Sequence, residues 1–238
     1  MQTINICSYH ASLGGFNSNL FGSKMRTLFH RAAREPVVIA NDDNFANNEK
    51  KNNPNEKFIV FINHPFDMIL SAYEHHKTTG ETYWAHREYR ELDLCVYEKL
   101  KNFTNLDREF EEFKGTYQNM MLSLGTERDM IIFEMLNSSK HTCQSFLSDY
   151  SCYKDAENYL FIRLESLRTT GAAKNLANTI VTFLNIPSHQ HEFENFLTSF
   201  CDFYQIKTNL FAEKFEKIHF DIFEQENCRD FLSLVDYS

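Results

Sequence analysis

The sequence is poor in the residues that interrupt regular structure. Its 238 residues include seven glycines, four prolines and a single tryptophan, whereas phenylalanine occurs 23 times. Because so few glycines and prolines leave little material for many tight turns, the composition favours long helices over an all-β structure. The 42% hydrophobic and 24% charged residues are typical of a packed globular protein, which excludes a disordered or fibrous chain.

Long apolar runs are also missing. The longest, Pro36 to Ala40 and Phe58 to Ile62, are far shorter than the roughly 20 residues that cross a bilayer, so we expect no transmembrane anchor. The first residues, Met-Gln-Thr-Ile-Asn-Ile-Cys, lack the basic segment and apolar core of a secretory signal. These features predict a cytoplasmic protein.

Clustered positive charge and paired cysteines are absent as well. The net charge is −9, with 33 acidic and 24 basic residues, and this excess of acid argues against a nucleic-acid partner. No Cys-x-x-Cys occurs, so the spacing predicts free, buried thiols and no metal site. The six cysteines are Cys7, Cys95, Cys143, Cys152, Cys201 and Cys228.

Short apolar runs alternate with helical patterns, which predicts an α/β fold. The run from Phe58 to Ile62 is apolar at every position, as expected for a parallel strand covered on both faces. We therefore expect a central parallel sheet of about four to five strands, flanked by many helices. The predicted strands are Thr3 to Ser8, Pro36 to Ala40, Phe58 to Ile62 and Tyr159 to Leu164.

Apolar residues at helical spacing predict the helices. Thr126 is a candidate cap for one of them, with Asp129 three residues later. The predicted helices follow Leu20, span 66–103 as two or more segments, cover 115–124, 130–147 and 172–184, and continue as two or three helices from His189 to the end. We expect a single domain over 1–238, with an insertion at 41–57 that holds seven asparagines.

The segment after the first predicted strand has the character of an anion-binding loop. Gly14 and Gly15 stand between that strand and a helix, whose first N–H groups and dipole favour a negative ligand. A plain strand-to-helix turn is the alternative. His10, at the end of the strand, is either a general base for an acceptor hydroxyl or a turn residue that bonds to the loop. The Gly-x-x-x-x-Gly-Lys-Ser/Thr motif of ATP-binding loops is absent, which makes a small-molecule kinase improbable.

The segment from Phe58 to Tyr73 carries a more specific pattern. An apolar strand is followed by Asn63-His64-Pro65, and then by Ser71-Ala72-Tyr73. This resembles the 3′-phosphate motif of the P-loop sulfotransferases, in which Arg-(Asp/His)-Pro ends a strand and a serine follows on the next helix. Two further stretches, at 116–134 and 159–187, are similar to later segments of the same family and stand in the same order.

The resemblance implies a three-layer P-loop-type α/β domain that transfers a sulfuryl group from 3′-phosphoadenylyl sulfate to a hydroxyl or amine. It implies a small-molecule or carbohydrate acceptor and no metal. The donor-binding residues that it implies are Ser12, Gly14, Gly15, Asn17, Ser18, Asn63 and Ser71. Glu134 follows three apolar residues, and it is either a buried acid that deprotonates the acceptor or part of a structural ion pair.

Two cationic positions of the family pattern are replaced in this sequence, Phe16 stands at the position of a family threonine, and the family's Arg-Lys-Gly segment is absent. Ser12 stands where the family has the lysine that neutralises the leaving group, and Asn63 stands where it has the arginine that binds the 3′-phosphate. These losses favour an alternative, a non-catalytic protein of the sulfotransferase fold that binds a nucleotide or a protein partner.

Overall fold

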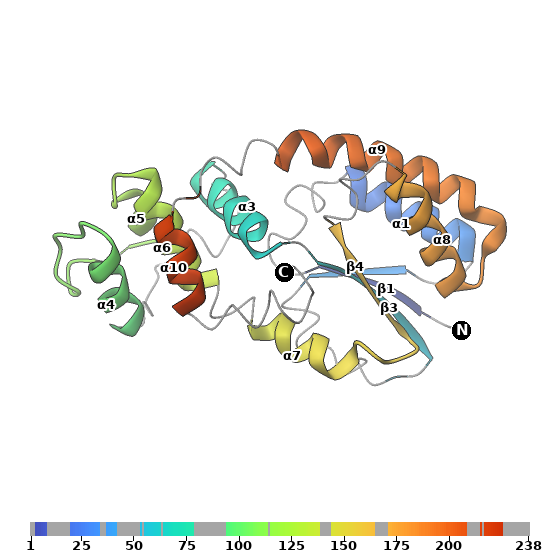
Figure 1. Cartoon of the computed structure of the whole chain (residues 1–238), viewed down its shortest axis with the longest axis horizontal. Coiled ribbons are helices and arrows are strands. Elements are labelled where there is room, and N and C mark those ends of the chain that lie inside the picture. The colour runs from blue at the N-terminus through green and yellow to red at the C-terminus, as the bar shows by residue number, and fades with distance from the viewer. Residues whose placement is uncertain are drawn as a thin grey trace. The chain divides into compact units, whose positions relative to one another are not determined.

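The computed structural model describes residues 3–8, 20–33, 37–41, 53, 55–62, 64–78, 94–113, 115–138, 144–164, 171–208, 215 and 217–225. These residues form an α/β structure with a parallel sheet and a larger number of helices (Figure 1). The predicted α/β class is confirmed.

Four parallel strands make the sheet, in the order β2-β1-β3-β4. Their bounds are Thr3–Ser8 for β1, Val37–Asn41 for β2, Glu56–Ile62 for β3 and Tyr159–Arg163 for β4. All four predicted strands are present, but β3 begins two residues before the predicted Phe58. Glu56 and Lys57 pair with β1 and thereby extend the strand into the predicted Asn-rich insertion.

The helices follow the predicted order. They are α1 (Leu20–Ala33), α3 (Pro65–Thr78), α4 (Leu94–Phe103), α5 (Tyr117–Leu122), α6 (Glu127–Ser138), α7 (Gln144–Tyr153), α8 (Ala172–Leu184), the short 3₁₀ helix η4 (Pro187–His189), α9 (Gln190–Thr208) and α10 (Lys217–Gln225). The predicted single helix over 130–147 is wrong, because α6 ends at Ser138 and α7 begins at Gln144. Asn137, Ser138 and Ser139 have low helix propensity and favour a helix end there.

The chain divides into two compact units. Unit 1 contains Met1–Asp67 and Ser148–Glu213, and unit 2 contains Met68–Leu147 and Lys214–Ser238. Helix α3 starts in unit 1 and continues in unit 2. The expected single domain over the whole chain stays a prediction.

One face of the sheet in unit 1 carries the main apolar core. Alternate residues of β1 and β3 point to this face, among them Ile6, Ile59 and Phe61, and they pack against α1, α8 and α9. In Figure 1 these three helices lie together on one side of the strands. Phe29 of α1 meets Phe193 of α9 edge to face, with ring centroids 4.8 Å apart. Burial of these side chains is the main force that holds the helices on the sheet.

The opposite face is covered by aromatic rings from α7. Tyr153 of α7 stacks on Tyr159 of β4 at 4.6 Å, and Tyr159 stacks in turn on Phe58 of β3 at 4.5 Å. This face also holds a buried polar pair, in which Asn5 donates a hydrogen bond of 2.6 Å from Nδ2 to Oε2 of Glu56. Helices on both faces explain why β3 is apolar throughout its centre.

Unit 2 is built around α6. Its residues from Asp129 to Asn137 are all buried, and α4, α5 and α10 pack around it. A helix that is covered on every side shows little amphipathic periodicity, in agreement with its mixed sequence.

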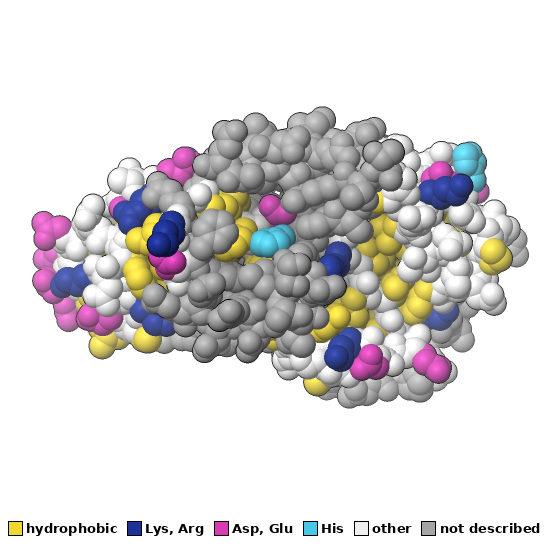
Figure 2. Space-filling model, in the orientation of Figure 1, with side chains coloured by type: hydrophobic (Ala, Val, Ile, Leu, Met, Phe, Trp, Pro, Cys, Tyr) yellow, Lys and Arg dark blue, Asp and Glu magenta, His cyan; other side chains and the backbone are white. Residues whose placement is uncertain are grey.

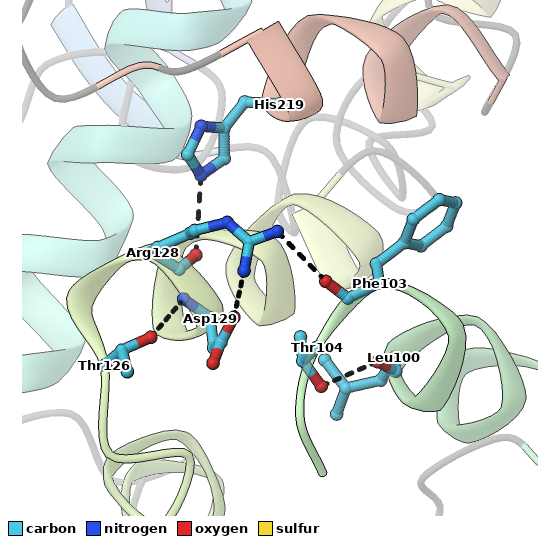
Figure 3. Close-up of polar contacts among 7 residues, drawn as sticks. All are labelled: Leu100, Phe103, Thr104, Thr126, Arg128, Asp129 and His219. Carbon is cyan, nitrogen blue, oxygen red and sulfur yellow. Dashed lines mark hydrogen bonds and ion pairs between the residues drawn. The ribbon is translucent and has the colours of Figure 1, made fainter.

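The start of α6 is tied down by polar contacts (Figure 3). The Asp129 backbone N–H donates to Oγ1 of Thr126 at 3.1 Å, which confirms the predicted cap. Arg128 donates to the Phe103 carbonyl of α4 at 3.4 Å, and His219 of α10 lies 3.4 Å from the Arg128 carbonyl. These bonds link three helices of unit 2 at one point.

Acidic and basic side chains are interspersed on the surface of unit 2 near α4 and α5 (Figure 2). Asp107, Glu109, Glu111 and Glu112 are exposed there, and Lys101 of α4 lies 3.8 Å from Glu109. The charge of Glu109 raises the pKa of Lys101 above its usual 10.5. The exposed Lys101 and Arg108 stand in the same segment, so the charge on this part of the surface is mixed.

The cysteine prediction is correct only in part. Among the cysteines whose burial the structure describes, Cys7 is buried, whereas Cys95 and Cys152 are exposed, and none of these three forms a disulfide. Cys95 lies in the first turn of α4 and Cys152 near the end of α7, on helix faces that periodicity alone did not assign to solvent.

Across the described segments, no helix has both the length and the apolar character that crossing a bilayer demands.

Candidate functional site

The carboxyl ends of β1 and β3 lie next to each other. The strands are hydrogen-bonded along their length, and their register pairs Ser8, the last residue of β1, with Phe61 of β3. The last residue of β1 therefore lies beside the end of β3, which α3 follows in the chain. The sequence predicts the phosphosulfate loop after β1 and the 3′-phosphate motif after β3.

The sheet changes its winding direction at these two strands. After β1 the chain forms α1 on one face and returns as β2 on one side of β1, whereas β3 lies on the other side. The connection from β3 to β4 ends with α7, which covers the opposite face. In open parallel sheets, connections that leave toward opposite faces open a crevice at the carboxyl ends of the strands, and ligands bind there.

Most predicted donor-binding residues lie outside the part of the chain that the structure describes. These are Ser12, Gly14, Gly15, Asn17, Ser18 and Asn63, together with the predicted base His10. Their roles stay predictions. The described members of the predicted set are Ser71 and Glu134.

The His-Pro pair of the predicted 3′-phosphate motif begins helix α3. Pro65 is its first residue, and the Phe66 backbone N–H donates a hydrogen bond of 3.2 Å to Nδ1 of His64. The rings of His64 and Phe66 stack, with centroids 5.3 Å apart. Proline is favoured in the first turn because its missing N–H has no partner there, and His64 satisfies one of the remaining donors.

Ser71 lies in the polar stripe of α3. Asp67, Ser71, Glu74 and Thr78 recur at spacings of four, three and four, which places them on one side of the helix. Ser71 is 9% exposed. Because Asp67 and Glu74 are acidic, a phosphate on this side of α3 would be held by neutral donors such as the Ser71 hydroxyl.

The opposite stripe of α3 is buried and ends in a polar network. His76 is 0% exposed and Glu134 is 1% exposed. Nδ1 of His76 lies 2.8 Å from Oε2 of Glu134, and the hydroxyl of Tyr117 donates to the same oxygen at 2.9 Å. The Tyr117 ring also meets the His76 ring edge to face at 5.3 Å. One carboxylate of α6 thus joins α3 to α5.

A second carboxylate of α6 repeats this arrangement closer to solvent. The hydroxyl of Tyr73 donates to Oε1 of Glu127 at 3.1 Å, and Nζ of Lys77 donates to the Tyr73 hydroxyl at 2.8 Å. Lys77 and Glu127 are 3.9 Å apart, and their side chains are 37% and 46% exposed. Each glutamate therefore accepts from one tyrosine and lies near one basic residue of α3.

The contacts of Glu134 with His76 and Tyr117 bear on its two predicted roles, a buried acid that deprotonates the acceptor or part of a structural ion pair. Its side chain is buried and bonded as a structural ion pair would be, and the catalytic role stays a prediction. Its partners Tyr117 and His76 were not predicted. The available signal was His76 itself, which continues the buried stripe of Phe66, Ile69 and Tyr73 at spacings of three, four and three.

No metal site is found in the described segments, where no three His, Cys, Asp or Glu side chains are grouped as ligands.

Comparison of the chain with family models, characterised proteins and solved structures finds no match in any of the three. The resemblance to sulfotransferases therefore depends on the sequence motifs quoted above.

Proposed function

We propose that the chain is a sulfotransferase-like protein that binds 3′-phosphoadenylyl sulfate and transfers its sulfuryl group to a hydroxyl or amine. The observation that carries the proposal is the pairing of β1 with β3. Both predicted donor-binding segments leave the sheet from neighbouring carboxyl ends, where the winding changes direction. A three-layer P-loop-type fold is proposed on the same ground, with four parallel strands covered on both faces.

The proposed chemistry is an in-line displacement at sulfur. The acceptor oxygen or nitrogen forms a bond to sulfur as the bond to the phosphate oxygen breaks, and adenosine 3′,5′-bisphosphate leaves. Backbone N–H groups around Gly14, Gly15 and Asn17 hold the phosphosulfate, with Ser12 and Ser18 beside them. Asn63 and Ser71 bind the 3′-phosphate, and His10 takes the acceptor proton. The acceptor is a small molecule or a carbohydrate, and the protein acts in the cytoplasm without a metal.

A second function is favoured by specific residues. Ser12 and Asn63 replace the two cations of the family motifs, and the Ser71 stripe carries Asp67 and Glu74. A protein of this kind would still bind the nucleotide, more weakly, and would not release adenosine 3′,5′-bisphosphate from the donor. It would use the fold to bind a nucleotide or a protein partner.

Thermal unfolding with and without millimolar adenosine 3′,5′-bisphosphate tests the nucleotide site. A ligand at 100 times its Kd stabilises the native state by about 2.7 kcal/mol, which gives a clear rise in Tm. We expect this rise in the wild type and its loss in Ser71→Ala. Ser148→Ala is the matched control, since Ser148 is an exposed helical serine of α7.

No rise in the wild type, or an equal rise in Ser71→Ala, contradicts the proposed site. Where the rise is present, incubation with 3′-phosphoadenylyl sulfate and a panel of phenols, sugars and amines separates the two functions. Release of adenosine 3′,5′-bisphosphate that depends on an acceptor identifies a transferase, and binding without release identifies the non-catalytic protein.

A further inference from the structure

Helix α3 has two distinct sides, and the network around Glu134 holds one of them. One side carries Phe66, Ile69, Tyr73 and His76, and the other carries Ser71, which is also buried at 9% exposed but lies between the half-exposed Asp67 and Glu74. Successive helical residues turn by about 100°, so Ser71 and Tyr73 differ by about 200° and Ser71 points away from the buried stripe. The side of α3 that contacts Glu134 is thus opposite the side that presents Ser71.

The contacts on the buried side are directional. Apolar side chains such as Ile69 tolerate small rotations of a helix, since their attraction has no preferred angle. The hydrogen bond from His76 to Glu134 is 2.8 Å long and lies where water has no access. Rotation of α3 away from this geometry would lengthen a buried hydrogen bond to a carboxylate, which is costly, so one rotation of α3 is favoured over its neighbours.

Tyr117 restrains the same carboxylate from α5. Its hydroxyl bonds to Oε2 of Glu134, the oxygen that His76 contacts, and its side chain is 2% exposed. With both partners in place, the Glu134 side chain has a fixed conformation on α6. The restrained Glu134 side chain therefore fixes where His76, and with it α3, contacts α6.

We propose that Glu134 is a positioning residue for Ser71, which acts by fixing the rotation of α3 through His76. The proposal rests on the function proposed above, in which Ser71 binds the 3′-phosphate. A hydroxyl donates well only over a narrow range of distance and angle, so a loosened α3 binds the nucleotide more weakly even when the protein is fully folded. Glu134 itself does not contact the nucleotide.

The decisive variant replaces the network with apolar residues. The triple variant His76→Leu, Glu134→Met, Tyr117→Phe removes both members of the buried His76–Glu134 pair together with the Tyr117 hydroxyl, and replacing a buried pair by apolar residues often leaves stability unchanged. We expect a normal unfolding transition and a loss of affinity for adenosine 3′,5′-bisphosphate of about tenfold, the scale of one hydrogen bond to a charged group. Isothermal titration calorimetry at a temperature where every variant is folded measures the affinity.

A double-mutant cycle separates positioning from a general structural role. Ser71→Ala weakens binding in the wild-type background, and we expect it to have little further effect in the triple variant, because Ser71 is already misplaced there. Glu127→Gln is the matched control: it removes the charge of the half-exposed carboxylate of α6, but its amide oxygen still accepts the hydrogen bond from Tyr73 of α3, so we expect an unchanged affinity. Should the triple variant not fold, Tyr117→Phe alone, which keeps His76 and Glu134 paired, is expected to weaken binding about threefold.

The outcomes distinguish the two proposals. A wild type that does not bind the nucleotide overturns the proposed function and the positioning role with it. A wild type that binds, together with folded network variants of equal affinity, overturns the positioning role alone. The same holds if Ser71→Ala weakens binding by the same factor in both backgrounds.

Discussion

Tyr159 lies between two nearly parallel aromatic rings. Its ring is inclined by 9° to Phe58 and by 8° to Tyr153, and the residue is 6% exposed. Burial raises the pKa of the Tyr159 phenol above its usual 10, and the neighbouring Tyr153 raises it further. The phenolate is disfavoured here because water cannot solvate it.

This shift predicts a loss of stability in alkali. The unfolded chain releases the Tyr159 proton near pH 10 while the folded chain retains it, so the contribution of Tyr159 is complete below pH 10 and is lost as the pH rises above it. We expect the free energy of unfolding of Tyr159→Phe to fall less steeply with pH than that of the wild type. Urea unfolding at a series of pH values from about 9 to 11 measures both slopes. Equal slopes would contradict the assigned shift.

Lys57 shows how a single residue links two elements. Its ammonium group donates to the Phe183 carbonyl in the last turn of α8, and it lies 4.9 Å from the centre of the Phe183 ring. Burial lowers the pKa of Lys57 below its usual 10.5. A cation at the carboxyl end of a helix is favourable, and here it holds α8 to β3.

At the scale of elements, α8 has clear signals at both ends. It follows Gly171, whose φ is 82°, and it ends at Asn185 in the left-handed conformation with φ 59°. The Ile186 backbone N–H donates to the Val181 carbonyl at 2.8 Å, which closes the last turn. Between these ends, apolar residues recur at helical spacing and face the core of unit 1.

The left-handed residue at the end of α8 allows a paired test. We expect Asn185→Ala to destabilise the protein by about 1 kcal/mol, because a Cβ without a polar group is disfavoured at this φ. Asn185→Gly is expected to keep or slightly increase stability, since glycine adopts the conformation without strain. Urea unfolding of the three proteins measures the difference. Equal stability of the Ala and Gly variants would contradict the cap.

At the scale of the whole molecule, the chain contains two units that are stabilised by different kinds of interaction. Unit 1 is a parallel sheet with an apolar core on one face and stacked aromatic rings on the other. Unit 2 has a central helix whose neighbours are joined to it by polar bonds, those of Glu134 buried and that of Arg128 partly buried. Separate cores permit separate opening of the units.

Hydrogen exchange tests this division. Tyr117→Phe removes one bond to a buried carboxylate, and we expect a loss of about 1.5 to 3 kcal/mol in the protection of amides in α5 and α6. Amides of β1 and β3 are expected to keep their wild-type protection. Ile59→Val, in the core of unit 1, is the reverse control and should affect the strands first. A uniform change across both units would show that the chain opens as one body.

The positions of most elements follow from the sequence because their signals are local. The apolar run that ends at Ile62 predicts β3, the spacing of apolar residues predicts α8 over 172–184, and Thr126 predicts the start of α6. Each of these signals involves residues within a few positions of one another. The break between α6 and α7 was missed, although the polar run from Asn137 to Thr142 marks it in the sequence.

Of the candidate site, the sequence determined the motifs, and tertiary structure decided which groups meet. The sequence placed Ser71 on a helix after a strand and singled out Glu134 as an acid in an apolar segment. Only the folded chain brings Glu134 to His76, 58 positions earlier, and sets the end of β1 beside β3. Such partners depend on how whole helices and strands pack. Packing is decided by the summed burial of many side chains, and short-range sequence patterns do not contain that sum.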